Sequence, residues 1–141
     1  PITQINHSVT RKRGAVRGFH FQYTPYTECK IVICLRGKVF DVAVDIRKDS
    51  STFLKWYGEI LSSENQKSLF ISEGFAHGFQ ALTDECELLY LHTANFQPQA
   101  EGGIHVADPV LGVTWPLAII DLSERDRSHT FIDDSFKGII V

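Results

Sequence analysis

Short segments in which apolar and polar residues alternate are the feature that most limits how this chain can fold. The clearest segment covers residues 39–46, where alternate side chains form two faces of one predicted strand. One face is apolar, and we expect it to pack in a core. The other is small and acidic, which is typical of a polar cavity wall. The first face holds Phe40, Val42, Val44 and Ile46, and the second holds Val39, Asp41, Ala43 and Asp45.

Strands and turns are predicted along almost the whole chain. Further strands are expected at residues 15–23, 31–35, 53–61, 68–71, 78–82 and 87–93, with turns at 62–65, 83–85 and 102–103. Only residues 122–130 suggest a helix, with Ser123 as its N-cap. This pattern predicts an all-β fold, a double-stranded β-helix or jelly-roll (cupin-like) barrel with one short C-terminal helix, whose interior can hold a ligand.

Length and composition narrow the class of protein. A chain of 141 residues is expected to form one domain, residues 1–141. The net charge of -3 gives no basic face for nucleic acid, and no segment approaches the ~18 apolar residues of a membrane helix. Three cysteines cannot all pair within one chain, so free thiols in a reducing cytoplasm are expected.

Two segments place a histidine between aromatic residues in strand-like surroundings. They are RGFHFQ at residues 17–22 and EGFAHGF at residues 73–79. An imidazole among apolar rings can act as a general base in a dry pocket, although a lone strand histidine is more often a core residue. Arg17 and His20 can face the same side only if Gly18 forms a bulge in the strand.

Three other residues can complete acid–base chemistry, and each has an alternative interpretation. Lys30 can stabilise an enolate oxygen or extend its amine to solvent. Tyr90 can donate a proton across the cavity or serve as a core ring. Asp126 can orient a histidine or simply assist the start of the predicted helix.

Metal binding is the alternative that a cupin-like barrel raises. Gly14 and His20 match the spacing of the first cupin motif, and Gly74 and His77 match the second, but Gln22 stands where another histidine is usual. Two imidazoles and a weak amide fall short of the three strong ligands of catalytic sites. We therefore expect a polar cavity with no metal and no cofactor.

Taken together, these motifs resemble the dTDP-4-dehydrorhamnose 3,5-epimerase family from about residue 6 to residue 126. The resemblance is carried by RGFHFQ, EGFAHGF, GKVFDVAVDIR at residues 37–47, DP at 108–109, GVTWP at 112–116 and LSERD at 122–126, in the family's order and spacing. It implies a metal-free, dimeric jelly roll that acts on nucleotide-diphosphate-linked 4-keto-6-deoxy sugars.

The resemblance also implies roles for individual residues. His20 is the expected base with Asp126 as its partner, Tyr90 is the acid on the opposite face, and Lys30 supports the enolate. Substrate contacts are expected from Arg17 (diphosphate or sugar), Gln22, the polar pair His77 and Asp41, and Gln4 and Asn6 (nucleobase).

The expected function is inversion at C3, C5 or both of such a sugar, in the cytoplasm and in a homodimer. The alternatives are a cupin-type 3,4-ketoisomerase and a binding relative without turnover. The sequence differs from the family in two places. It begins downstream of the family's usual first segment, and Phe96 stands where tyrosine is usual.

Overall fold

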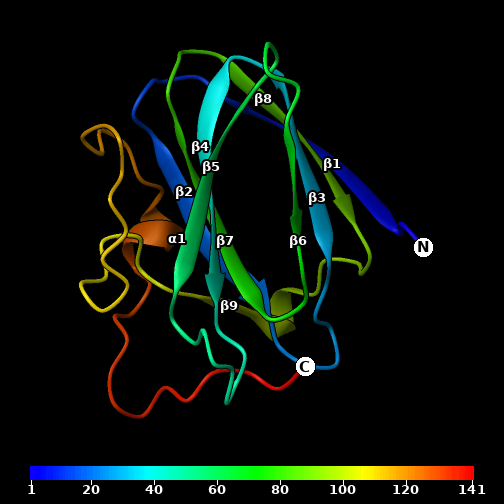
Figure 1. Ribbon diagram of the computed structural model, residues 1–141, viewed down its shortest axis with the longest axis vertical. Coiled ribbons are helices and arrows are strands. Elements are labelled where there is room, and N and C mark those ends of the chain that lie inside the picture. The colour runs from blue at the N-terminus through cyan, green and yellow to red at the C-terminus, as the bar shows by residue number, and fades with distance from the viewer.

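Two antiparallel β-sheets face each other in the computed structural model, which describes residues 1–141 (Figure 1). One sheet has the strand order β1-β8-β3-β6 and the other the order β5-β4-β7-β2-β9. The predicted all-β jelly-roll class with one short helix is confirmed. The strands are β1 (Gln4–Thr10), β2 (Val16–Gln22), β3 (Lys30–Arg36), β4 (Lys38–Asp45), β5 (Trp56–Ser62), β6 (Ser68–Ile71), β7 (Phe75–Ala81), β8 (Cys86–His92) and β9 (Glu101–Gly103).

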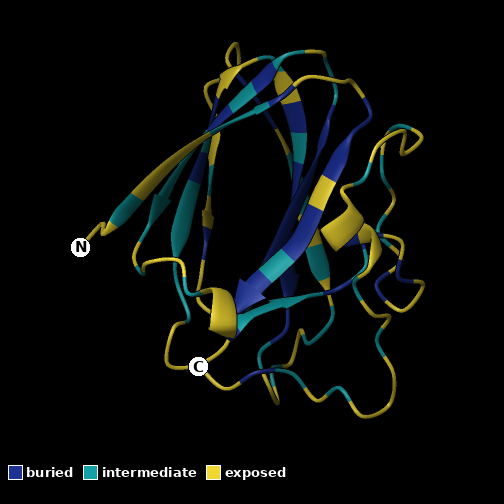
Figure 2. Cartoon of the chain, turned by 180° about the vertical axis from the view of Figure 1, so that it is seen from behind, coloured by how far each residue is buried: buried dark blue, intermediate teal, exposed yellow.

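Two strands were not predicted. β1 has few apolar residues and lies at the edge of its sheet, so its sequence lacks the alternation that marks a half-buried strand. β9 occupies the place of the predicted turn at 102–103, which is therefore wrong. Its two glycines pair with β2 through the backbone, a contact that leaves no side-chain pattern. Figure 2 shows a yellow, exposed stretch in the strand that follows the N label, whereas β4 and β7 inside the other sheet are mostly buried.

Two apolar clusters cover the two faces of the five-stranded sheet. The cluster between the sheets includes Val39 and Ala43, together with Val32 and Leu88 of the opposite sheet. The other lies on the outer face, where residues 104–139 cover it. Both faces of β4 are therefore packed, and the prediction of one apolar and one cavity face is only partly right.

Asp45 is a second correction on β4. Its carboxylate accepts hydrogen bonds from Arg47, Ser50 and Thr52, so it holds the loop after the strand instead of lining a cavity.

The one α-helix is short and capped. α1 (Glu124–Arg127) begins after Ser123, whose Oγ accepts the Asp126 N–H, so the predicted N-cap is confirmed. The predicted length of 122–130 is wrong. The helix ends at Arg127, with Ser128 as its C-cap, and it lies beside β2 (Figure 1). No helix has the length and hydrophobicity needed to cross a membrane.

Gly18 forms the bulge that the sequence required. Arg17 pairs with Phe79 and His20 with His77, so three steps along β2 match two along β7. Gly18 has φ +130°, and a Cβ there would lie 2.6 Å from Gly78 Cα and 2.8 Å from His77 O. Only glycine fits this close approach of two backbones, and the bulge turns Arg17 and His20 toward the same cavity.

We predict that Gly18→Ala destabilises the protein much more than Gly112→Ala. Gly112 also has positive φ (+61°), but its Cβ would meet only Pro109 O, at 3.8 Å. Gly112→Ala should therefore lower the free energy of unfolding by about 1 kcal/mol, because it adds only left-handed backbone strain. Gly18→Ala should lower it by about 3 kcal/mol or more, because overpacking adds to the strain. Urea unfolding measures both, and equal losses would contradict the close approach.

Candidate active site

A cavity of about 240 Å³ lies between the sheets and receives side chains from both. It contains most of the residues that the sequence singled out. Those that line it are Gln4, Arg17, His20, Gln22, Lys30, His77 and Tyr90. Asp126, Asp41 and Asn6 do not line it but contact residues that do.

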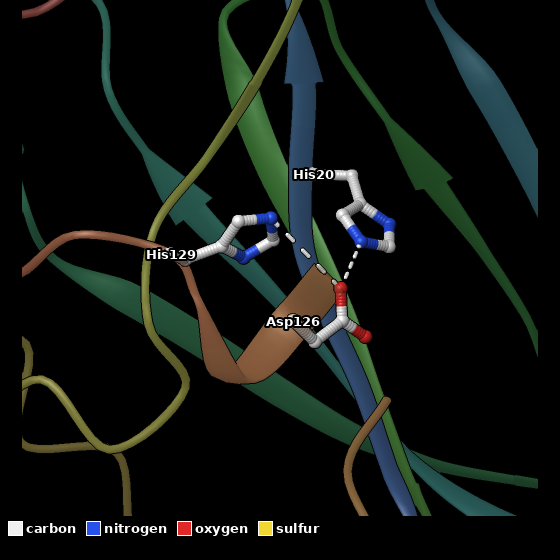
Figure 3. A group of neighbouring side chains, drawn as sticks. All are labelled: His20, Asp126 and His129. Carbon is white, nitrogen blue, oxygen red and sulfur yellow. Dashed lines mark hydrogen bonds and ion pairs between the residues drawn. The ribbon is translucent and has the colours of Figure 1, made fainter. Parts of the chain in front are cut away.

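The side chains of His20 and Asp126 form a close pair at one wall of this cavity. His20 Nε2 lies 2.6 Å from Asp126 Oδ1, and the second carboxylate oxygen accepts the Gly18 N–H at 3.1 Å. Figure 3 shows that the other ring nitrogen of His20 points away from Asp126. Asp126 is buried, whereas the His20 side chain keeps 26% exposure. The bulge amide and the imidazole therefore share one carboxylate.

The protonation of this pair follows from its contacts. Burial raises the pKa of Asp126, but the hydrogen bond and charge of His20 and the Gly18 N–H hold it below its usual value. An ionised carboxylate can only accept, so His20 Nε2 carries the proton. In the neutral ring Nδ1 then has a free lone pair, as a general base requires.

His129 is a neighbour of this pair that the sequence did not single out. Its ring packs edge-on against the His20 ring, with the two ring centroids 5.5 Å apart, and its Nε2 lies 3.9 Å from Asp126 Oδ1 (Figure 3). The possible ligand atoms of His20, Asp126 and His129 all lie within 4.8 Å of one another. However, Arg125 Nη2 lies 3.2 Å from His20 Nε2, and its positive charge opposes a cation at this point.

His77 and Asp41 form a second pair, as predicted. His77 Nε2 lies 2.6 Å from Asp41 Oδ1, and both side chains are buried. Burial lowers the pKa of His77, although the nearby Asp41 acts in the opposite direction. Asp41 reaches the cavity only through His77, so any role of Asp41 in binding is indirect.

Tyr90 and Lys30 come from the sheet opposite His20. Burial raises the pKa of Tyr90, and the charge of Asp41 adds to this, so the phenol keeps its proton at neutral pH. Lys30 begins β3, and burial lowers the pKa of its amine. An imidazole, a phenol and an amine therefore surround one space.

The amides of the site are largely occupied by protein contacts. Gln22 donates to Tyr26 O and accepts the Gln97 N–H, which ties two loops to β2. Gln4 donates to Asn6 Oδ1 and accepts the Phe96 N–H. Arg17 is exposed and lines the cavity opening.

Sequence reasoning also missed Glu28 and His92, which line the same cavity. Neither falls in one of the motifs that carry the family resemblance. The only signal was the position of each residue close to Lys30 or Tyr90, and this says nothing about chemistry without the sheet register.

The sequence profile described as dTDP-4-dehydrorhamnose 3,5-epimerase matches residues 1–134 of this chain. The chain belongs to this epimerase family. It is 46% identical over 136 residues to the dTDP-4-dehydrorhamnose 3,5-epimerase of Shigella flexneri, and the match covers 96% of this chain and 75% of that relative. It is 43% identical over 134 residues to the dTDP-4-dehydrorhamnose 3-epimerase of Streptomyces niveus, covering 95% and 64% of the two chains.

A solved epimerase structure agrees with this assignment. The dTDP-6-deoxy-D-glucose-3,5-epimerase of Legionella pneumophila, in complex with dTDP-4-keto-L-rhamnose, superposes with a TM-score of 0.91 at 39% identity. The match covers 100% of this chain and 76% of that one. Family members therefore share this fold, and their names include both 3,5-epimerases and a 3-epimerase.

We predict that His20→Ala raises the pKa of Asp126, because the largest influences that keep it low come from the imidazole. Carboxyl ¹³C NMR titration measures this pKa, with His7→Ala on the outer surface as control. The ionised Asp126 stabilises the folded protein at pH values above its pKa in the unfolded chain, and this stabilisation is lost as the pH falls through its lower pKa in the folded state. Because His20→Ala raises the folded-state pKa, the variant should lose less stability on acidification. An unchanged Asp126 titration would contradict the pairing.

Proposed function

We propose that the protein inverts C3, C5 or both of a nucleotide-linked 4-keto-6-deoxy sugar by proton transfer through an enolate. The observation that carries this proposal is the placement of His20 and Tyr90 on facing sheets around one cavity, with Lys30 beside them. Membership of the epimerase family supports the same reaction class. The substrate is proposed to be dTDP-linked, as in the Legionella complex.

The proposed steps use only these side chains. The C4 ketone acidifies the hydrogens on C3 and C5, and His20 Nδ1 removes one of them. Asp126 stabilises the imidazolium that forms, while the Lys30 ammonium stabilises the negative C4 oxygen. Tyr90 then returns a proton from the opposite side and is left as a phenolate. Proton exchange with solvent restores both residues.

The remaining residues are proposed to bind the rest of the substrate. Arg17 is suited to the diphosphate, because it is exposed at the cavity opening and its guanidinium can bind phosphate oxygens in pairs. Gln4 and Asn6 are proposed to contact the nucleobase from β1. Gln22, and His77 held by Asp41, are proposed to contact the sugar.

We predict that wild-type protein exchanges hydrogen for deuterium at C3 or C5 of a dTDP-4-keto-6-deoxy sugar in deuterated water. His20→Ala should lower this exchange by about 10²–10⁴, the usual contribution of a general base, while nucleotide binding persists. Proton NMR follows both substrate and product, with His7→Ala as control. A relocated carbonyl would establish a ketoisomerase instead, and no turnover by wild type would favour a binding protein.

Tyr90→Phe is predicted to impair inversion more than proton removal. The variant keeps the aromatic ring at position 90 and the base His20 but lacks the proton donor. Deuterium-labelled starting material should therefore accumulate relative to inverted product. The same NMR experiment gives both rates. An equal loss of exchange and product would contradict the assignment of base and acid to opposite faces.

We also propose that the protein is a homodimer joined through the outer face of the sheet β1-β8-β3-β6. An apolar row crosses this face, because Ile5 pairs with Leu91, Leu91 with Ile31, and Ile31 with Phe70. Ile5 and Phe70 are 63% and 61% exposed. Contiguous apolar surface of this kind favours association with a second copy.

For this dimer, Phe70→Lys is expected to weaken self-association at least about tenfold, or about 1.4 kcal/mol. Analytical ultracentrifugation measures the effect. Ile60→Lys is the matched control, since Ile60 is 43% exposed on β5 of the other sheet. A wild-type monomer, or equal effects of the two changes, would contradict the proposed face.

A cytoplasmic location is proposed as well. It is supported by Cys29, Cys34 and Cys86, which are all free thiols, the last two buried.

A further inference from the structure

A third histidine–carboxylate pair faces the cavity, and it takes no part in the proton transfers proposed above. His92 Nδ1 lies 2.6 Å from Glu28 Oε1, and the two side chains are only 12% and 11% exposed. His92 ends β8, and Glu28 precedes β3 by two residues. Two largely buried ionisable groups at the wall of a cavity are a candidate for function.

Glu28 is also the anion that lies next to Lys30. The Lys30 amine is 3.8 Å from Glu28 Oε1, the same oxygen that binds His92. The sheet register places His92 directly opposite Lys30 on the neighbouring strand. Lysine, glutamate and histidine therefore form one cluster at the end of β3 and β8.

Lys30 needs such an anion. Burial lowers the pKa of its amine, while the negative charges of Glu28, Asp41 and Glu101 oppose this, Glu28 most strongly. An amine that has lost its proton offers no positive charge to an enolate oxygen. The proposed task of Lys30 therefore depends on the carboxylates around it.

His92 is suited to orient Glu28 without adding charge. A carboxylate only accepts hydrogen bonds, so Nδ1 donates and Nε2 keeps the lone pair of a neutral ring. His92 Nε2 is buried and has no hydrogen-bond partner. A charged ring would bury a second N–H without an acceptor, which is costly. The pair thus carries one negative charge, which balances the one positive charge of Lys30.

We propose that Glu28, oriented by His92, is a positioning residue that keeps Lys30 charged and directed at the carbonyl oxygen of the sugar. This inference rests on the proposed function, because it assigns Glu28 and His92 to the task of Lys30. Both act through the amine and not on the reacting carbons. Besides the three carboxylates and His92, the titratable or charged groups that line the cavity with Lys30 are His77, which is buried, and Tyr90, which keeps its proton. His20 and Arg17 line the same cavity from β2.

The direct test is a titration of Lys30 in the whole 141-residue chain without substrate, monitored by NMR of ¹³C-labelled lysine. Glu28→Gln keeps the shape but removes the charge, so Lys30 should lose its proton about one pH unit lower than in wild type. His92→Asn should cause a smaller shift of the same sign. Glu59→Gln is the matched control, because Glu59 lies on β5 and pairs with Lys67, an exposed lysine outside the cavity. An unchanged Lys30 titration in both Glu28→Gln and His92→Asn would overturn the inference.

Activity separates failure of this inference from failure of the proposed function. In Glu28→Gln, the basic limb of the kcat/KM profile should move about one unit lower, with the acidic limb unchanged. If Lys30→Gln abolishes deuterium exchange but Glu28→Gln changes neither the Lys30 titration nor the pH profile of kcat/KM, the inference is wrong and the proposed function stands. If Lys30→Gln exchanges deuterium like wild type, the catalytic role of Lys30 is wrong, and with it the purpose assigned to Glu28.

Discussion

The Asp126 carboxylate joins the three parts of the protein on which the proposed base depends. One oxygen accepts the amide of the Gly18 bulge, and the other binds His20. The same residue is held at the start of α1, where its N–H reaches Ser123. A strand, a bulge and a helix are therefore fixed at one buried carboxylate, and the direction of the imidazole follows from that arrangement. Loss of any one part would leave a buried polar group without a partner.

Charge inside the cavity is organised as pairs. Three histidines face it, and each has its own carboxylate: Asp126 for His20, Asp41 for His77 and Glu28 for His92. Buried charges are stable only when they are paired or hydrogen-bonded, so this pattern allows a polar cavity beside the apolar cluster that lies between the sheets. It also keeps each imidazole in one tautomer. His20 has the most exposed side chain of the three, which fits its proposed role as the base.

Local patterns predicted the parts of the structure that depend on neighbouring residues. The strand at Ser68–Ile71, the N-cap Ser123 and the need for a bulge at Gly18 were all readable from nearby residues. Nearby residues could not predict that residues 104–139 cover the outer face of β4, because this contact joins segments far apart in the chain. His129, Glu28 and His92 were missed for the same reason. Each gains its meaning from a partner that only the sheet register or the helix brings near.

The proposed reaction requires His20 and Tyr90 to meet one sugar ring from opposite sides. The decisive measurement is a crystal structure with a dTDP-linked 6-deoxy sugar that lacks the ketone and so cannot react. We expect the ring to lie between His20 Nδ1 and the Tyr90 hydroxyl, with the C4 oxygen facing Lys30. A sugar ring that lies outside this cavity, or that presents one face to both side chains, would contradict it.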